Sequence, residues 1–127
     1  DAVIWKFDSV GNLDTSFGDG GKVVLAGTAG GYSEDEVNDL MIDSSGRLLA
    51  AGTSKNQYDR NSMVVWRFTS SGALDTSFGT DGSFIYNRVA DDFGEAIAQS
   101  PDGGLIVVGS SGNDSGNFDM AIWKLYQ

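Results

Sequence analysis

The six residues LDTSFG occur twice in this chain of 127 residues, at 13–18 and again at 74–79. The likeness extends beyond the hexapeptide: when residues 3–21 are set over residues 64–82, 12 of the 19 positions carry the same residue. A second pair of similar segments, MIDSSGRLLAAG and AQSPDGGLIVVG, follows further along the chain. The chain is therefore built from repeats of one unit of about 60 residues, and repetition on that scale indicates a repeat architecture.

Three segments of the repeat share an alternating pattern of apolar residues: AVIWKF at 2–7, MVVWRF at 63–68 and MAIWKL at 120–125. Every second residue is apolar around a central Trp, and Lys or Arg lies on the opposite face. This two-residue period is typical of a half-buried strand. Because Val, Phe or Leu share the face of each Trp, we expect core between neighbouring units, rather than a sugar-stacking row, at Trp5, Trp66 and Trp123.

Three further strand types complete the unit, each present twice, at 22–27 and 83–87, 36–42 and 94–99, and 47–52 and 104–109. The turns DSSG and SPDGG join the last two types into hairpins. No window shows sustained helical spacing. Four short antiparallel strands per unit predict a β-propeller blade. A sandwich of meanders is the alternative, but it gives no reason for sequence identity between successive units.

The predicted fold class is therefore all-β, with four-stranded antiparallel blades of the β-propeller type. The chain forms one domain over 1–127, with a first repeat at about 3–63, a second at about 64–120 and the start of a third at 121–127. Closed propellers hold about 4 to 8 blades, so two repeats do not close a ring. The start at Asp1 suits a mature product or a fragment. We expect either a piece of a longer repeat protein or association of copies into a ring or a filament.

The repeated LDTSFG segment predicts a structured loop between two strands rather than a ligand loop. An Asp followed by Thr and Ser accepts hydrogen bonds from the backbone N–H groups ahead of it, as in an Asx-turn or a helix cap. Leu and Phe supply apolar anchors, and the Gly suits a left-handed residue at the end of a turn. The residues expected to hold this loop are Leu13, Asp14, Phe17 and Gly18, with their counterparts Leu74, Asp75, Phe78 and Gly79.

The composition of the chain excludes several classes of partner and of site. Eighteen acidic and eight basic residues give a net charge of −10, which argues against nucleic acid or an anionic membrane surface as partner. The chain has no Cys and no His, which removes disulfides, thiolate catalysis, imidazole bases and the usual zinc ligands. No apolar run reaches the length of a membrane span. We therefore expect no enzyme activity, no cofactor and no membrane insertion.

Acidic and amide residues cluster in three segments, at 32–39, 89–95 and 111–119. Oxygen-rich loops suit Ca²⁺, but none of them carries the D-x-[DN]-x-[DN]-G spacing of a defined calcium loop. Polar loops on an acidic surface are the simpler interpretation. If Ca²⁺ binds, the first candidate ligands are Asp114, Asn117 and Asp119, and the next are Asp91, Asp92 and Glu95. A hydrolase based on the second group is a further, weaker alternative.

The pattern G-x-LDTSFG-x-x-G, followed by a PDGGLIVVG hairpin and an AIWKL strand, resembles the delta-60 repeat, a propeller-type repeat of bacterial secreted and surface proteins. The resemblance covers nearly the whole chain, although DSSGRLLAAG replaces the usual Pro-Asp-Gly turn in one repeat. It implies a β-propeller in an extracellular or cell-surface setting, and it carries no catalytic motif. We expect a non-enzymatic structural segment that associates with copies of itself or with further repeats. The alternative is a module whose loops on one propeller face bind carbohydrate, protein or Ca²⁺.

Overall fold

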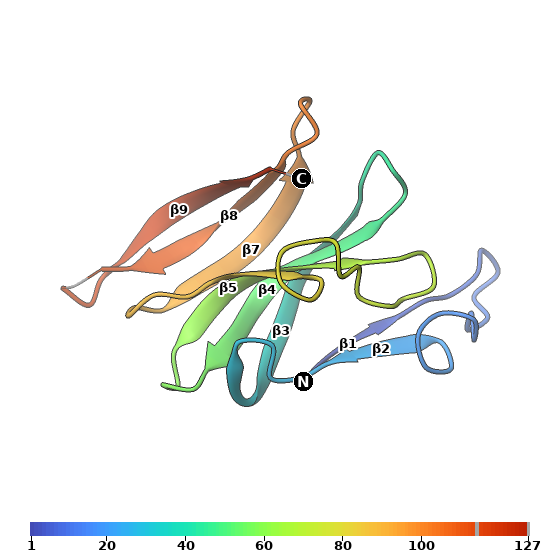
Figure 1. Cartoon of the computed structure of the whole chain (residues 1–127), viewed down its shortest axis with the longest axis horizontal. Coiled ribbons are helices and arrows are strands. Elements are labelled where there is room, and N and C mark those ends of the chain that lie inside the picture. The colour runs from blue at the N-terminus through green and yellow to red at the C-terminus, as the bar shows by residue number, and fades with distance from the viewer. Residues whose placement is uncertain (114, 127) are drawn as a thin grey trace.

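The computed structural model describes residues 1–113 and 115–126, with all of their side chains except those of residues 32 and 33. In this part of the chain the regular elements are nine β-strands arranged in three antiparallel sheets (Figure 1). No helix in the described residues is long and apolar enough to cross a membrane. The prediction of an all-β antiparallel fold is confirmed.

Within each sheet, every strand pairs with the next one along the chain, so each sheet is a meander. The first sheet holds β1 (Ala2–Trp5) and β2 (Lys22–Leu25). The central sheet holds β3 (Gly30–Ile42), β4 (Leu48–Asn56), β5 (Asn61–Phe68) and β6 (Ser83–Tyr86). The third sheet holds β7 (Asp92–Gln99), β8 (Leu105–Gly112) and β9 (Phe118–Leu125). Only the central sheet is therefore a complete four-stranded blade.

The structural blade and the sequence repeat begin at different strands. The sequence repeat begins at about residue 3, on the Trp strand, whereas the complete blade begins with β3 and ends with β6. The first sheet accordingly consists of the last two strands of a blade, and the third sheet of the first three. The pairing of β1 with β2 repeats that of β5 with β6: Trp5 lies opposite Lys22 as Trp66 lies opposite Ser83.

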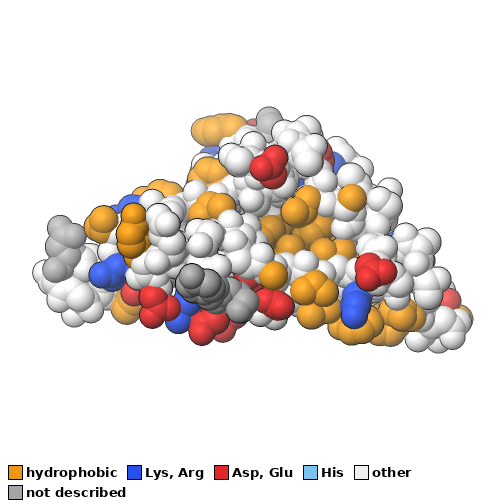
Figure 2. Space-filling view, turned by 60° about the horizontal axis from the view of Figure 1, so that its bottom comes forward, with side chains coloured by type: hydrophobic (Ala, Val, Ile, Leu, Met, Phe, Trp, Pro, Cys, Tyr) orange, Lys and Arg blue, Asp and Glu red, His pale blue; other side chains and the backbone are white. Residues whose placement is uncertain are grey.

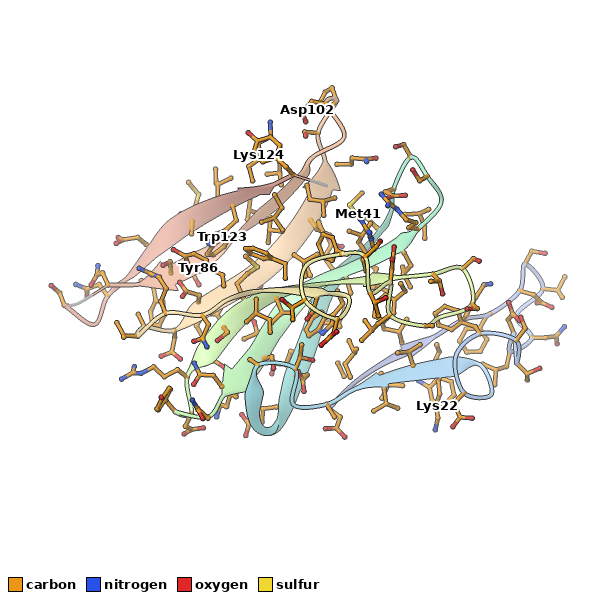
Figure 3. The ribbon with its side chains drawn as sticks, in the orientation of Figure 1. Lys22, Met41, Tyr86, Asp102, Trp123 and Lys124 are labelled. Carbon is orange, nitrogen blue, oxygen red and sulfur yellow. The ribbon has the colours of Figure 1, made fainter. Side chains whose placement is uncertain are left out.

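The three sheets stack face to face, with the complete blade in the middle (Figure 1). One core cluster lies between the first and central sheets and contains Ala2, Ile4, Phe17, Leu25, Ala50, Val64, Trp66 and Phe68. The other lies between the central and third sheets and contains Leu49, Ala51, Met63, Val65, Phe78, Ile97, Leu105 and Val107. At the edge of this second cluster the rings of Tyr86 and Trp123 meet edge to face, 5.7 Å apart (Figure 3).

The prediction that the Trp strand is half-buried is wrong for β5. Alternate residues of this strand face the first sheet and the third sheet, so Val64 and Val65 are both fully buried. Arg67, on the face opposite Trp66, is also buried. The physical reason is that a blade covers each side of β5, which leaves no face of the strand for solvent.

The polar segment after β2 is also more ordered than the sequence indicated. A strand was expected from residue 36, but β3 begins at Gly30 and pairs irregularly with β4. The buried Asp35 carboxylate accepts hydrogen bonds from the backbone N–H of Gly27 at 2.6 Å and of Thr28 at 3.3 Å. This carboxylate satisfies buried backbone donors at the crossing from one sheet to the next.

Candidate functional site

The repeated LDTSFG segment forms a tight loop that is closed by its own aspartate. In the first repeat, Asp14 Oδ1 accepts hydrogen bonds from the backbone N–H of Ser16 at 3.1 Å and from its hydroxyl at 2.5 Å. Phe17 is buried, and Gly18 has a φ of 58°. Leu13, expected as a second anchor, is only half-buried. The Lys6 ammonium lies 2.8 Å from Asp14, and its hydrogen bond, with those from Ser16, lowers the pKa of Asp14 to about 2.

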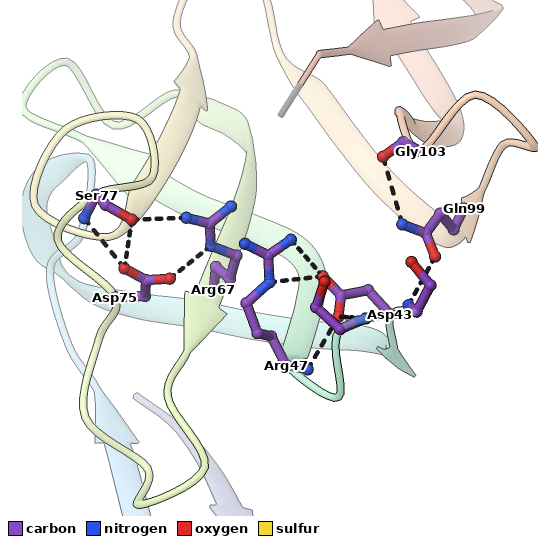
Figure 4. A network of polar contacts seen from close by, with 9 residues as sticks. Asp43, Arg47, Arg67, Asp75, Ser77, Gln99 and Gly103 are labelled. Carbon is purple, nitrogen blue, oxygen red and sulfur yellow. Dashed lines mark hydrogen bonds and ion pairs between the residues drawn. The ribbon is translucent and has the colours of Figure 1, made fainter.

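The second repeat builds the same loop around a buried cation (Figure 4). Arg67 Nε lies 2.9 Å from Asp75 Oδ2, and Arg67 Nη2 donates to the Ser77 hydroxyl at 2.9 Å. The guanidinium also stacks over the buried Phe78 ring, 4.7 Å from its centre. Hydrogen bonds from Ser77, and the nearby Arg67, lower the pKa of Asp75. Gly79 has a φ of 56° and Leu74 is half-exposed. Asp14 is thus bonded to its own loop and to Lys6 just after β1, and Asp75 to its own loop and to Arg67 of β5.

Polar bonds also connect the turns of neighbouring blades (Figure 4). The backbone N–H of Ser44 donates to Gln99 Oε1 at 2.8 Å, and Gln99 Nε2 donates to the carbonyl of Gly103 at 3.3 Å. Beside them, burial raises the pKa of Asp43, but hydrogen bonds from the Arg47 side chain and nearby backbone lower it overall. The hydrogen bond from Ser44 to Gln99 therefore connects the central sheet to the third sheet.

The calcium candidates lie in loops, and Asp114 falls outside the described residues. Asp119 Oδ2 accepts a hydrogen bond from Asn113 Nδ2 at 3.0 Å, and the backbone N–H of Asn117 donates to Asn113 Oδ1 at 3.1 Å. These bonds close the hairpin between β8 and β9. Among the residues that the structure describes, no group of three or more carboxylates is placed to hold a metal ion.

The second group of candidates fastens the start of β7 to its neighbours. Asp91 Oδ1 accepts hydrogen bonds from the backbone N–H of Asn61 at 2.7 Å and from its side-chain amide at 3.0 Å. Asp92 is fully buried, and Arg88 lies 3.1 Å from it. Glu95 is exposed on β7. At least two of these three carboxylates, Asp91 and Asp92, thus have structural partners, and no sequence motif marks them.

The surfaces that stand out are two apolar sheet faces at the ends of the stack. Equivalent positions of the repeat differ sharply in exposure: Trp66 is fully buried while Trp5 is 51% exposed, and Met63 is fully buried while Met120 is 82% exposed. We call the face of the first sheet the N-terminal open face; it is formed by Val3, Trp5, Phe7 and Val24. The C-terminal open face belongs to the third sheet and is formed by Val108, Met120 and Ile122.

An apolar groove adjoins the N-terminal open face because the first sheet lacks two strands of a blade. Leu40 of β3 is 46% exposed, whereas its equivalent on β7, Ile97, is 7% exposed and packed under the central sheet. The groove has a volume of about 270 Å³ and its apolar lining includes Ile4, Trp5, Phe17, Leu40, Ile42 and Leu48. Hydrophobic side chains gather on the right of Figure 2, the side on which β1 and β2 lie.

Comparison with known proteins identifies the blade. Residues 44–78 match the model of a family described as a domain of unknown function (DUF5122) beta-propeller. Residues 44–78 are therefore similar to a β-propeller repeat of that family. The DUF5122 match spans β4, β5 and the LDTSF part of the loop, so it lies within the complete blade. It bears out the resemblance to propeller-type repeats of the delta-60 kind. No curated protein matches the chain, and no solved structure does.

Proposed function

We propose that this chain is a non-enzymatic structural module, a β-propeller segment that assembles with further blades through its two open faces. The observation that supports this proposal is that apolar side chains at equivalent positions of the repeat differ in exposure. Val64, Trp66 and Phe68 are fully buried against the first sheet, while their equivalents Val3, Trp5 and Phe7 are about half-exposed. Contiguous exposed apolar surface of this kind favours a binding partner, and the chain's own interior supplies the matching surface.

Two further observations support a structural role. The sequence holds no His and no Cys, so the usual nucleophiles and bases of catalysis are few. The carboxylates of the repeated loop, Asp14 and Asp75, are hydrogen-bonded within that loop. The extracellular or cell-surface setting belongs to the same proposal, and it is supported by the sequence resemblance to repeats of secreted and surface proteins.

The test is the mass and shape of the native particle, from light scattering and negative-stain microscopy of one sample. We expect a particle larger than the 13.4 kDa chain, as a ring or a thread. Trp5→Glu and Ile122→Glu each place a charge on one open face and should reduce the particle mass. Tyr58→Glu, at an exposed turn between β4 and β5, is the matched control. A single monomeric species at all concentrations would contradict the proposal.

A further inference from the structure

We propose that the central blade binds a uronic acid unit of an acidic polysaccharide, at the end of the blade that lies opposite the LDTSFG loops. The site is a groove of about 630 Å³, lined by Tyr58, Arg60, Asn87, Arg88 and Val89. These residues come from the turn between β4 and β5 and from the connection that leaves β6 for β7, which lie at the same end of the central sheet (Figure 1). We call this hollow the turn groove. It is separate from the two open faces, so the proposal does not depend on assembly.

Two residues of the turn groove, Tyr58 and Arg60, are not needed to form the turn that carries them. In this turn the side-chain oxygen of Asn56 accepts hydrogen bonds from the backbone N–H of Tyr58 at 2.9 Å and of Arg60 at 3.2 Å. The turn between β8 and β9 repeats both bonds between its own Asn and the backbone N–H of Ser115 at 3.0 Å and of Asn117 at 3.1 Å. The same turn therefore forms with Ser and Asn at these two places, and the Tyr and Arg side chains have no part in closing it.

The charge of Arg60 is not compensated by a neighbouring carboxylate. The other three arginines of the chain each form an ion pair with an aspartate, whereas the Arg60 guanidinium forms no ion pair and no hydrogen bond with another described residue. Asp91 lines an adjoining hollow together with Arg60, but its Oδ1 accepts hydrogen bonds from Asn61 instead. The planar guanidinium thus remains available to the two oxygens of a carboxylate, which its paired N–H donors match.

The opposite wall of the turn groove also presents hydrogen-bond donors. Asn87 Oδ1 accepts a hydrogen bond from Asn56 Nδ2 at 2.8 Å, which orients the Asn87 amide, and the amide N–H groups of Asn87 bond to no other described residue. Arg88 is held in place by the buried Asp92 at 3.1 Å and lies over the Tyr86 ring, 5.4 Å from its centre. A ligand that fits this wall accepts hydrogen bonds, as carboxylate and hydroxyl oxygens do.

Exposed apolar side chains complete the turn groove and decide the class of ligand. Tyr58 is 74% exposed and Val89 is 83% exposed, and an aromatic ring presents a flat apolar surface with a polar tip. A uronic acid unit combines an apolar C–H face with a carboxylate and hydroxyl oxygens, so it matches Tyr58, Arg60 and Asn87 together. A free sulfate or phosphate ion would leave the apolar side chains uncovered. A peptide would bring backbone N–H groups, which need acceptors, to a wall that presents donors.

Titration calorimetry of the full chain with small acidic saccharides tests the proposal. The probes are the trimers of galacturonate, mannuronate and guluronate, each compared with its fully methyl-esterified form, which keeps the sugar ring and removes the charge. We expect at least one trimer to bind, and its ester to bind about tenfold or more weakly, because the ester loses a charge-assisted hydrogen bond.

Two variants of the turn test the residues without disturbing the fold. Tyr58→Ser and Arg60→Asn introduce the side chains that the turn between β8 and β9 already carries, so both variants should fold. Each should weaken binding of the acidic trimer about tenfold or more. Arg60→Lys should recover only part of the affinity, because an ammonium group does not bind a carboxylate through two parallel bonds. Gln57→Ala changes an exposed residue of the same turn and should leave the affinity unchanged.

Three results would overturn the proposal. Equal binding of a trimer and its ester would overturn recognition of the carboxylate. Tighter binding of the tripeptide Gly-Gly-Val than of any trimer would overturn the saccharide as ligand. No binding of any of the three trimers at millimolar concentration would overturn the site itself. Tyr58→Ser and Arg60→Asn should leave the particle mass unchanged, because neither residue lies on an open face, so saccharide binding and assembly succeed or fail independently.

Discussion

Gly52 and Gly109 show at the residue scale how the repeat constrains its own sequence. They occupy equivalent places on β4 and β8, and each lies beside an irregularity in the pairing with the preceding strand. A Cβ atom at Gly52 would lie 1.9 Å from the carbonyl oxygen of Glu36, and one at Gly109 would lie 1.9 Å from that of Phe93. A glycine inside a strand at such a close backbone approach is required by geometry rather than by turn formation.

Gly52→Ala should therefore destabilise the protein strongly, because the atom it meets is backbone that cannot rotate away. We expect a loss of about 3 kcal/mol in the free energy of unfolding, from overpacking of a tight interior. Gly46→Ala is the control: its Cβ meets nothing within 4 Å, and its φ of +76° leaves a left-handed backbone penalty of about 1 kcal/mol. Urea titrations of both variants provide the measurement. Equal losses would show that the strand spacing adjusts freely.

At the scale of the element, the three Trp strands have nearly the same sequence and different surroundings. Trp66→Ala should lower the free energy of unfolding by about 3 to 5 kcal/mol, as expected for a fully buried Trp. It also removes the hydrogen bond from Trp66 Nε1 to the Thr28 hydroxyl at 3.0 Å. Trp5→Ala should lower it by less than about 1 kcal/mol, because that side chain is half-exposed. Urea unfolding at low protein concentration measures both variants.

The particle mass should rank Trp5→Ala and Trp66→Ala in the opposite order to the free energy of unfolding. Trp5→Ala removes a large apolar side chain from the N-terminal open face, so it should reduce particle mass by light scattering more than it reduces stability. Equal destabilisation by both substitutions would mean that β1 is covered by further structure, and the open face would not exist.

The same strands show how far the sequence predicts the structure. Alternation and turn residues place eight of the nine strands to within four residues at each end, because backbone pairing and side-chain period leave few choices. The sequence pattern does not reveal that β5 is buried on both faces, because an Arg in a strand usually indicates a solvent-exposed face. Arg67 is buried only because Asp75 and Ser77 bond its guanidinium. The extension of β3 back to Gly30 depends on Asp35 bonding to Gly27 and Thr28. Such partners lie apart in the sequence and carry no motif.

The sequence predicts that two repeats alone leave an open blade face and unpaired edges, but not where they lie. Counting strands against blades shows that some strand edge must lack a neighbour. The sequence does not show where the blade is cut, because a cyclic pattern of four strands has no marked beginning. In the structure a blade ends with the strand type of β2 and β6, and the next blade begins with the strand type of β3 and β7. Leu40 is exposed because the first sheet has only two strands of a blade, whereas its equivalent Ile97 packs against the complete central sheet.

At the scale of the whole molecule, the acidic composition and the turn aspartates set the dependence of stability on pH. Hydrogen bonds lower the pKa of five described aspartates. At Asp14 and Asp102 the largest contribution comes from the ammonium groups of Lys6 and Lys124. At Asp8, Asp43 and Asp75 the donors lie in or beside the turn itself. A carboxyl whose pKa is lower in the folded state than in the unfolded chain adds stability above the unfolded value, here 3.8. That stability is lost as the pH falls through the folded value, which is about 2 for Asp14.

Two opposing effects on the free energy of unfolding therefore act in different parts of the acid pH range. From neutral pH to the isoelectric point of about 4.1, the net charge falls from −10 toward zero and self-repulsion weakens. The free energy of unfolding should hold or rise there. Between about pH 4 and pH 2 the turn aspartates take up protons and it should fall steeply. The raised pKa values of Lys55 and Lys124 do not enter, because their contributions are lost only above 10.5.

Urea titrations at a series of pH values, at one ionic strength and a dilution that keeps the chain monomeric, measure this profile. Asp14→Asn should flatten the fall below pH 4, because an amide cannot take up the proton that Asp14 binds on unfolding. Asp19→Asn is the matched control: it neutralises one exposed aspartate and changes the net charge equally, so a flattening seen only with Asp14→Asn comes from the loop and not from the charge. A profile that is flat down to about pH 2 would mean that the turn hydrogen bonds survive protonation. The repeated LDTSFG loop would then be held by Phe17 and backbone bonds rather than by its aspartate.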